Sequence, residues 1–183
     1  APIAPIYSGL KALHLTTSIV EGRRAISPIV APASGVHDRA AATIQEAVRR
    51  AFGVTLPVVA DDAPEARVPL TGHAIVLGNR STSRTLSALY DRFFTFVDLK
   101  YPGPGGHVLQ SLHNPFGNGR NAIVVGGSDA AGVQAAAEAL ATRVREPTGR
   151  DLVLGWLQDI RLPEGTRVPE SLEEACIWEA SRD

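Results

Sequence analysis

The feature that most constrains the fold is a strand, turn and helix pattern in NAIVVGGSDAAGVQAAAEALATRV, residues 121–144. Its apolar, β-branched run at residues 123–125 is typical of a strand covered on both faces. Gly126 and Gly127 permit a tight turn, and we expect a positive φ at Gly127. Small residues recur along the helix, which lets its backbone approach a sheet closely. The pattern predicts an α/β unit without a catalytic side chain on the helix.

The same alternation of short apolar runs with helical periodicity continues through the chain. Strands are predicted over residues 25–31, 55–60, 74–77, 106–112, 122–125 and 151–160, with an edge strand within 13–20. Helices are predicted over residues 38–52, 82–91, 129–145 and 170–181. Pro28 cannot donate to a strand ladder, so the strand that contains it is expected at an edge or a bulge. The elements predict a mixed β-sheet with helices packed on its faces, a three-layer α/β sandwich.

The length of 183 residues suits one domain of ordinary size. We expect an irregular leading segment over residues 1–24, an α/β domain over 25–160, and a linker with a terminal helix over 161–183. The sequence has no methionine and begins Ala-Pro-Ile-Ala-Pro. This beginning suits a mature chain after signal-peptide removal or a fragment of a longer protein, so the expected location is extracellular or periplasmic.

Charge and composition argue against two classes of partner. The net charge of -1 gives no bulk attraction to nucleic acid or anionic lipid. No apolar run approaches the roughly 20 residues that a membrane span needs. We therefore expect binding neither to nucleic acid nor to a membrane.

The single cysteine, Cys176, excludes an internal disulfide framework, and its apolar neighbours suit a buried structural thiol.

The order of the elements resembles a known accessory domain. The likeness is carried by GVTLPVV at residues 53–59, IVLG at 75–78, the strand that begins at Gly106, and IVVGGSD with Gly132-Val133 at 123–133. These segments are similar to the α/β domain that precedes the catalytic barrel in β-hexosaminidase-like and α-glucuronidase-like glycoside hydrolases.

The resemblance covers residues 26–145 and implies a domain that does not cleave sugar itself. Because no barrel follows within 183 residues, it also implies a detached or truncated part of a larger glycoside hydrolase or polysaccharide lyase. Two loops, residues 101–106 and 113–120, are richer in aromatic, histidine and glycine residues than that domain. These loops leave room for a role beyond that of a scaffold.

The turn Gly126-Gly127-Ser128-Asp129 is a candidate for binding an anion or for capping the helix. A helix N-terminus attracts anions, but the P-loop and dinucleotide patterns are both incomplete here, and Asp129 would repel phosphate. Ala130 stands where a nucleophile elbow needs glycine. The pattern therefore favours capping by Ser128 or Asp129.

Metal binding and paired-carboxylate chemistry find little support in the spacing. His107 and His113 lie about 20 Å apart along an extended strand, too far to share a metal, and no metal-binding motif is present. We expect no metal and no cofactor. Asp61-Asp62 and Glu173-Glu174 are adjacent in sequence, so their side chains diverge, and they are expected to be solvated surface.

A cluster of aromatic residues is the best candidate for binding. Its members are Tyr90, Phe93, Phe94, Phe96 and Tyr101. Sugar rings stack on flat aromatic faces, although packing in the core or against a neighbouring domain is the simpler role for the three phenylalanines. The predicted binding residues lie in or between the loops 93–106 and 113–120, and they are Tyr101, His107, His113, Asn114, Phe116 and Arg120.

The predicted function is that of a non-catalytic accessory or interaction domain, with a catalytic domain, another protein chain or a glycan as its partner. No catalytic residue is assigned. One alternative is a freestanding glycan-active hydrolase or lyase with His107, His113, Asp98 and Arg120 in a loop-built site. The other is a structural subunit that assembles with copies of itself or with a partner chain.

Overall fold

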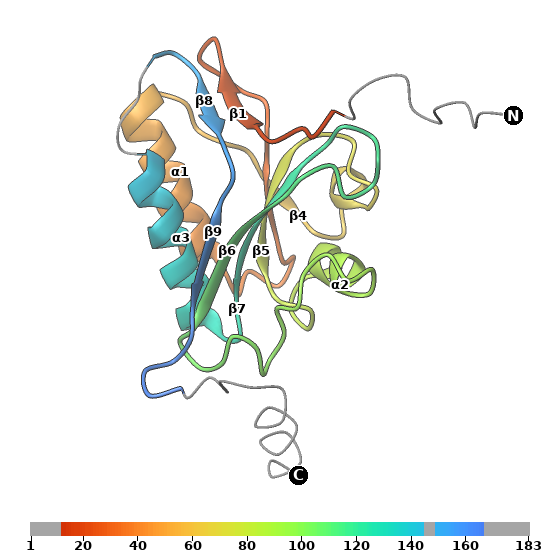
Figure 1. Cartoon of the computed structure of the whole chain (residues 1–183). Helices are drawn as coiled ribbons and strands as arrows, with labels where there is room; N and C mark the ends of the chain where they lie inside the picture. Colours follow the sequence, from red (N-terminus) through yellow and green to blue (C-terminus); the bar gives the residue numbers. More distant parts are fainter. Residues whose placement is uncertain (1–11, 145–148, 167–183) are drawn as a thin grey trace, which may run out of the picture.

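The computed structural model of the chain describes residues 12–144 and 149–166. In these residues a mixed six-stranded sheet carries α1 (Asp38–Phe52) and α3 (Ala130–Val144) on one face and α2 (Arg84–Tyr90) on the other (Figure 1). The predicted fold class, an α/β sandwich, is confirmed. The helix predicted over residues 170–181 lies outside the described residues.

Four neighbouring strands on one side of the six-stranded sheet are parallel, and the pairings on the other side are antiparallel. Its order is β4 (Val58–Ala60), β3 (Ile29–Ala31), β5 (Ala74–Gly78), β7 (Ala122–Gly127), β6 (His107–Leu112) and β9 (Gln158–Arg161). The first four strands run parallel, while β6 is antiparallel to both β7 and β9. The predicted strands over residues 55–60, 74–77 and 122–125 and the second part of 25–31 therefore lie in one sheet.

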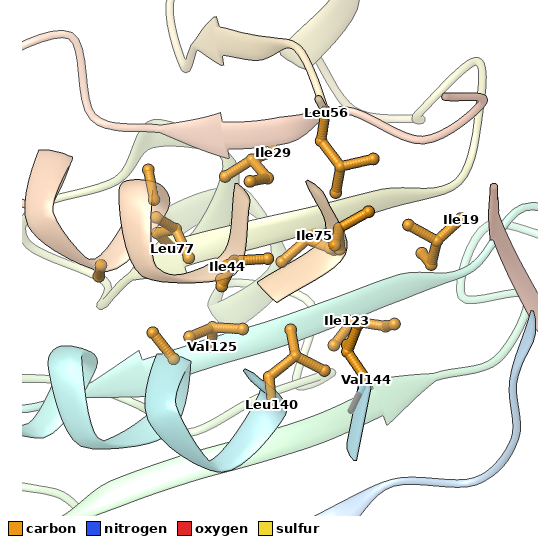
Figure 2. Close-up of a cluster of buried hydrophobic side chains, with 14 of the residues drawn as sticks. Ile19, Ile29, Ile44, Leu56, Ile75, Leu77, Ile123, Val125, Leu140 and Val144 are labelled. Carbon is orange, nitrogen blue, oxygen red and sulfur yellow. The ribbon is translucent and has the colours of Figure 1, made fainter. Parts of the chain in front are cut away.

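Strand alternation divides the interior into two cores. Ile75 and Leu77 face α1 and α3, whereas Val76 between them faces α2, because successive side chains of a strand point to opposite faces. Figure 2 shows Ile44 of α1 and Leu140 of α3 packed over the first of these faces. Helix α1 ends as predicted at Gly53, which has a φ of 69° and donates its N–H to Arg49 O.

Two expectations about the outer strands are wrong. Residues 151–160 form two short strands rather than one: β8 (Leu152–Leu154) joins β1 (Thr17–Glu21) and β2 (Arg24–Ala25) in a small antiparallel sheet, and β9 joins the large sheet. Residues 25–31 are also divided, between β2 and β3. In both cases a non-strand interval, containing Gly155 or Pro28, lets the chain pass from one sheet to the other.

Pro28 does not place its strand at an edge. Strand β3 lies between β4 and β5 inside the sheet. Pro28 immediately precedes β3, where its missing N–H costs nothing, and its carbonyl oxygen accepts a hydrogen bond from Ile75 N at 3.0 Å. The proline is therefore compatible with an interior strand.

Helix α3 approaches the sheet through three glycines. A Cβ on Gly127 would lie 2.5 Å from the backbone of Gly132 and Val133, and a Cβ on Gly132 would overlap the carbonyl oxygen of Gly106. The positive φ expected at Gly127 is wrong, because Gly127 is not among the residues with positive φ. Glycine is required at this position for close approach rather than for an unusual backbone conformation.

We predict that Gly127→Ala lowers the free energy of unfolding by about 1–3 kcal/mol, since the added methyl group must displace the backbone of α3. Gly72→Ala is the matched control, because a Cβ on Gly72 meets nothing within 4 Å. Its effect should stay below about 1 kcal/mol. Equilibrium urea unfolding followed by circular dichroism measures both. Equal stability of the two variants would contradict the close-packing argument.

Candidate binding surfaces at the two ends of the sheet

The structure separates the predicted site residues into two groups. Strand β6 runs from the carboxyl end of the parallel strands, where His107 pairs with Gly127, to their amino end, where Leu112 pairs with Ala122. Tyr101 lies at the carboxyl end with His107, whereas the other group follows β6 at the amino end and consists of His113, Asn114, Phe116 and Arg120. The four residues of the alternative enzyme site are divided in the same way, so they do not form one site.

At the carboxyl end, Asp98 organises residues 91–106. Its carboxylate accepts hydrogen bonds from the N–H groups of Lys100 and Tyr101, both at 2.8 Å, and from the hydroxyl of Tyr90 at 3.1 Å. Burial raises the pKa of Asp98, but these hydrogen bonds outweigh burial and hold that pKa below its usual value. The hydrogen bond from Tyr90 to this carboxylate raises the pKa of the Tyr90 hydroxyl. These bonds fix the backbone from Asp98 to Tyr101 and attach it to Tyr90 of α2.

This segment exposes large apolar side chains. Phe94 packs against the second core, as expected, and its ring lies edge-on to that of Phe116. Phe93 and Phe96, for which packing was also the simpler expectation, are 77% and 57% exposed, and Leu99 is 62% exposed. Tyr101 is exposed as well. We call Phe93, Phe96, Leu99 and Tyr101 the exposed loop cluster.

The glycine turn before α3 is satisfied internally. Asp129 Oδ1 accepts the N–H of Gly132 at 2.7 Å, which is the geometry of a helix cap. Asp129 Oδ2 accepts from Gly105 N and Ser128 Oγ from Gly103 N, both at 2.9 Å. The side chain of Asp129 therefore bonds the first turn of α3. The same two side chains attach residues 103–105 to the start of the helix.

A buried polar network connects the ends of β5 and β7. Asn79 donates to Gly127 O at 3.0 Å and to Ser128 O at 3.3 Å, and its Oδ1 accepts from the N–H of Ser81 and Thr82. His37 is 3% exposed and lies with its Nε2 3.3 Å from Thr82 Oγ1. Burial lowers the pKa of His37 and so favours the neutral form of its ring.

Asp61 corrects another expectation. It was predicted to be solvated, yet it is buried at the end of β4. Its Oδ1 accepts from Ala33 N at 3.0 Å and its Oδ2 from Arg84 N at 2.7 Å. The position of Asp61 directly after a predicted strand was the signal that could have indicated this role.

His107 begins β6 beside an acidic group. Its Nε2 lies 3.7 Å from Asp159 Oδ1, outside hydrogen-bonding distance, and the other carboxylate oxygen of Asp159 accepts from Arg143 at 2.9 Å. Burial lowers the pKa of His107 although Asp159 acts in the opposite direction. The hydrogen bond from Arg143 lowers the pKa of Asp159. The arrangement is an ion pair between Arg143 and Asp159, with His107 beside it.

At the amino end, Asn121 connects three segments. It is fully buried, its amide nitrogen donates to His14 O, Thr16 O and Thr17 Oγ1, and its Oδ1 accepts from Asn114 N. Its backbone N–H donates to Nδ1 of His73 at 2.9 Å. The loop 113–120 is therefore anchored to the small sheet and to β7. Arg120 itself is exposed.

Trp156 is an exposed aromatic residue that the sequence prediction missed. Its ring is 68% exposed and lies 5.8 Å from that of His113 between centroids, at an interplanar angle of 64°. The backbone on both sides is fixed, because Ser111 Oγ donates to Gly155 O and accepts from Leu157 N. A fixed, exposed tryptophan is a feature of ligand-binding surfaces.

The described residues contain neither a cluster of metal-binding side chains nor a helix that could span a membrane. Among residues 12–144 and 149–166, no group of three histidine, cysteine, aspartate or glutamate side chains is arranged to hold a metal ion. None of the helices in this part of the chain has the length and apolar character needed to cross a membrane.

Comparison with known proteins finds a distant structural neighbour. No family model matches the chain, and no curated protein gives a significant match. The structure is similar to that of CpGH84D, a glycoside hydrolase family 84 protein, with a TM-score of 0.49 and 17% sequence identity. The match covers 85% of this chain and 23% of that chain. A likeness of this level assigns no activity, ligand or partner to the chain.

We predict that stability falls as the pH is lowered from about 7 to about 5. Burial is the leading cause of a pKa below 6.5 at four histidines, namely His37, His73, His107 and His113. As the pH falls, the unfolded chain therefore takes up protons at these histidines before the folded chain does. Stability is fully retained at a pH above the pKa of histidine in the unfolded chain, and it is lost as the pH falls through the pKa values of these histidines in the folded chain. Protonation of His73 would also remove the acceptor of the Asn121 N–H.

Melting temperatures between pH 8 and pH 5 test this prediction. His73→Gln keeps an acceptor oxygen but does not titrate, so its melting temperature should vary less with pH than that of the unchanged chain. A melting temperature that is constant or rises toward pH 5 would show that the histidines do not control acid stability.

Proposed function

We propose that the chain is a non-catalytic accessory domain of a secreted carbohydrate-processing protein, and that the exposed loop cluster docks it on a folded domain of that protein. The sequence resemblance supplies the carbohydrate context. The observation that carries the docking role is the exposure of Phe93, Phe96 and Leu99 within seven residues of one fixed segment. Contiguous exposed apolar surface is typical of protein interfaces.

Backbone geometry supports the same role. Phe93 has a φ of 60°, a conformation that bulky side chains rarely adopt and that costs on the order of 1 kcal/mol or more. Its N–H donates to Tyr90 O and the next N–H donates to Leu89 O, so the turn holds this conformation. A strained backbone that exposes an apolar ring to solvent does not stabilise the isolated domain. A partner that covered the ring would bury its apolar surface.

Rigidity of the segment makes docking favourable. Arg80 N donates to Val97 O at 2.9 Å, and the bonds to Asp98, Ser128 and Asp129 fix the remainder. A surface that is ordered before binding loses less conformational entropy when it binds. The cluster also has a polar rim, since Lys100 and Asp91 are exposed beside it.

The test uses the polypeptide encoded beside this chain in the same reading frame, purified separately and titrated calorimetrically. Leu99→Ser and Phe93→Ser should each weaken binding at least about tenfold. Leu13→Ser is the matched control, because Leu13 is 60% exposed against 62% for Leu99 and lies outside the cluster. It should leave the affinity unchanged.

Three results would contradict the proposal. One is a reading frame that encodes no further folded domain. Another is binding that Leu13→Ser weakens as much as Leu99→Ser does. The third is turnover of aryl-glycosides by the purified chain, which would favour the freestanding enzyme instead.

A second candidate function, glycan binding at the amino end of the sheet, is favoured by the exposed ring of Trp156 beside His113. Sugar rings stack on such aromatic faces. In a Trp178→Phe variant, Trp156 is the sole tryptophan and reports binding by fluorescence.

We predict that chitohexaose or xylohexaose changes this fluorescence and that His113→Ala weakens the response, because His113 contacts the Trp156 ring. His107→Ala, at the opposite end of β6, is the control. An unchanged spectrum at about 10 mM of either sugar would exclude affinity tighter than the millimolar range and with it this second candidate.

A further inference from the structure

The carboxyl end of the sheet contains a crevice that is separate from the exposed loop cluster. From β3 the chain continues to β4 on one side through α1, and from β5 it continues toward β6 and β7 on the other side through α2 (Figure 1). Adjacent parallel strands whose connections leave in opposite directions create an uncovered crevice at their carboxyl ends. A depression of about 370 Å³ lies at this position. The lining residues that matter here are Ser34, Asp61, Arg80, Ser81, Arg84 and Ser87.

The crevice is built by hydrogen bonds within the chain. Asp61 connects the loop after β3 to the start of α2, because its two carboxylate oxygens accept from Ala33 N and Arg84 N. Asn79 fixes the turn that follows β5 by accepting from Ser81 N and Thr82 N. The walls are therefore set before any ligand arrives, which lowers the entropic cost of binding.

The groups left to contact a ligand are side-chain donors. The N–H groups of Ser81, Thr82, Ser83 and Arg84 already have acceptors in the chain. Both carboxylate oxygens of Asp61 are used as well. Among the residues that line the crevice, Arg84, Ser34, Ser81 and Ser87 have side-chain donors that make no hydrogen bond within residues 12–144 and 149–166, whereas the guanidinium of Arg80 lies 3.5 Å from Asp91.

Arg84 is the better of the two guanidinium groups. No ion pair to Arg84 is found in residues 12–144 and 149–166, whereas Arg80 lies 3.5 Å from Asp91. Arg80 also lies 4.9 Å above the Tyr90 ring, which restricts where its guanidinium can move. A planar guanidinium without a carboxylate partner binds carboxylate and phosphate oxygens through two parallel hydrogen bonds.

We propose that this crevice binds a small hydroxylated molecule that carries one carboxylate or phosphate group. Arg84 binds the anionic group, Arg80 supports it, and the serine hydroxyls bind the hydroxyl groups of the ligand. The volume lies at the low end of the range for ligand pockets, so the ligand has the size of a single sugar rather than of a chain. This site does not depend on the docking role of the exposed loop cluster.

The test titrates the chain with D-glucuronate, glucose 6-phosphate, glucose and inorganic phosphate, followed by residue-resolved amide NMR shifts. The two charged sugars should shift residues 33–35, 61 and 80–87, and at least one should bind with a Kd in the millimolar range or tighter. Glucose and inorganic phosphate should each bind at least about tenfold more weakly, because each lacks half of the recognised chemistry.

Arg84→Gln should lower the affinity about tenfold or more, since it removes the charge and leaves the backbone N–H bond to Asp61 in place. Ser87→Ala should weaken the charged sugars and leave inorganic phosphate unchanged. Arg50→Gln, which removes a surface arginine at the far end of α1, should change neither. Circular dichroism confirms that each variant is folded.

The outcomes separate this site from the docking proposal. Leu99→Ser should leave the sugar titrations unchanged, so loss of one function does not imply loss of the other. Inorganic phosphate that binds as tightly as glucose 6-phosphate would overturn the proposed ligand class. Full affinity in Arg84→Gln, or shifts outside the crevice, would overturn the site.

Discussion

The contact of α3 with the sheet through Gly106, Gly127 and Gly132 is the constraint on which the other arrangements at the carboxyl end depend. A Cβ at Gly127 or Gly132 would meet backbone, so the helix can reach its position only with glycine there. The close approach places Ser128 and Asp129 where they accept the N–H groups of Gly103 and Gly105. Residues 91–106 are thereby tied to the helix, and the exposed loop cluster has a fixed backbone as a consequence of packing elsewhere.

Two buried asparagines perform corresponding tasks at opposite ends of the sheet. Asn79 joins the turn after β5 to the end of β7, and Asn121 joins the loop after β6 to the segment before β1. Each has donors and acceptors in one short side chain, so it satisfies several backbone groups that strands leave unpaired where they end. Other polar side chains hold the segments that carry the exposed residues: Asp98 accepts from the N–H groups that flank Leu99 on its carboxyl side, and Ser111 bonds the backbone on both sides of Trp156. Leu99 and Trp156 therefore have defined backbone positions without being packed.

Sequence patterns predicted the regular elements well, because period and termination signals are local. Helix α1 begins and ends at the predicted residues, and β5 and β7 lie in one sheet as the apolar runs implied. The assignments that failed depend on distant partners. The position of Asp61 directly after a strand could indicate a buried acceptor, but it does not identify Ala33 and Arg84 as the partners. No local signal shows that Phe94 would turn inward while Phe93 faces solvent. The predicted site residues were separated for a similar reason, because β6 begins at the carboxyl end of the parallel strands and ends at their amino end.

The glycine turn before α3 is the most conspicuous motif of the sequence, but most of its hydrogen-bonding groups are already paired within the chain. In Gly126-Gly127-Ser128-Asp129, the Asp129 carboxylate caps α3 and accepts from Gly105 N, and the Ser128 hydroxyl accepts from Gly103 N. The carbonyl oxygens of Gly127 and Ser128 accept hydrogen bonds from the Asn79 amide group. Groups that are already paired contribute little to recognition, because a ligand would have to replace a bond of equal strength. Ligand recognition instead depends on side chains that have a fixed backbone and whose ends are neither paired nor packed within the described residues. Arg84, Trp156 and the exposed loop cluster meet that condition, and they lie on surfaces that the strand-and-turn pattern alone does not indicate.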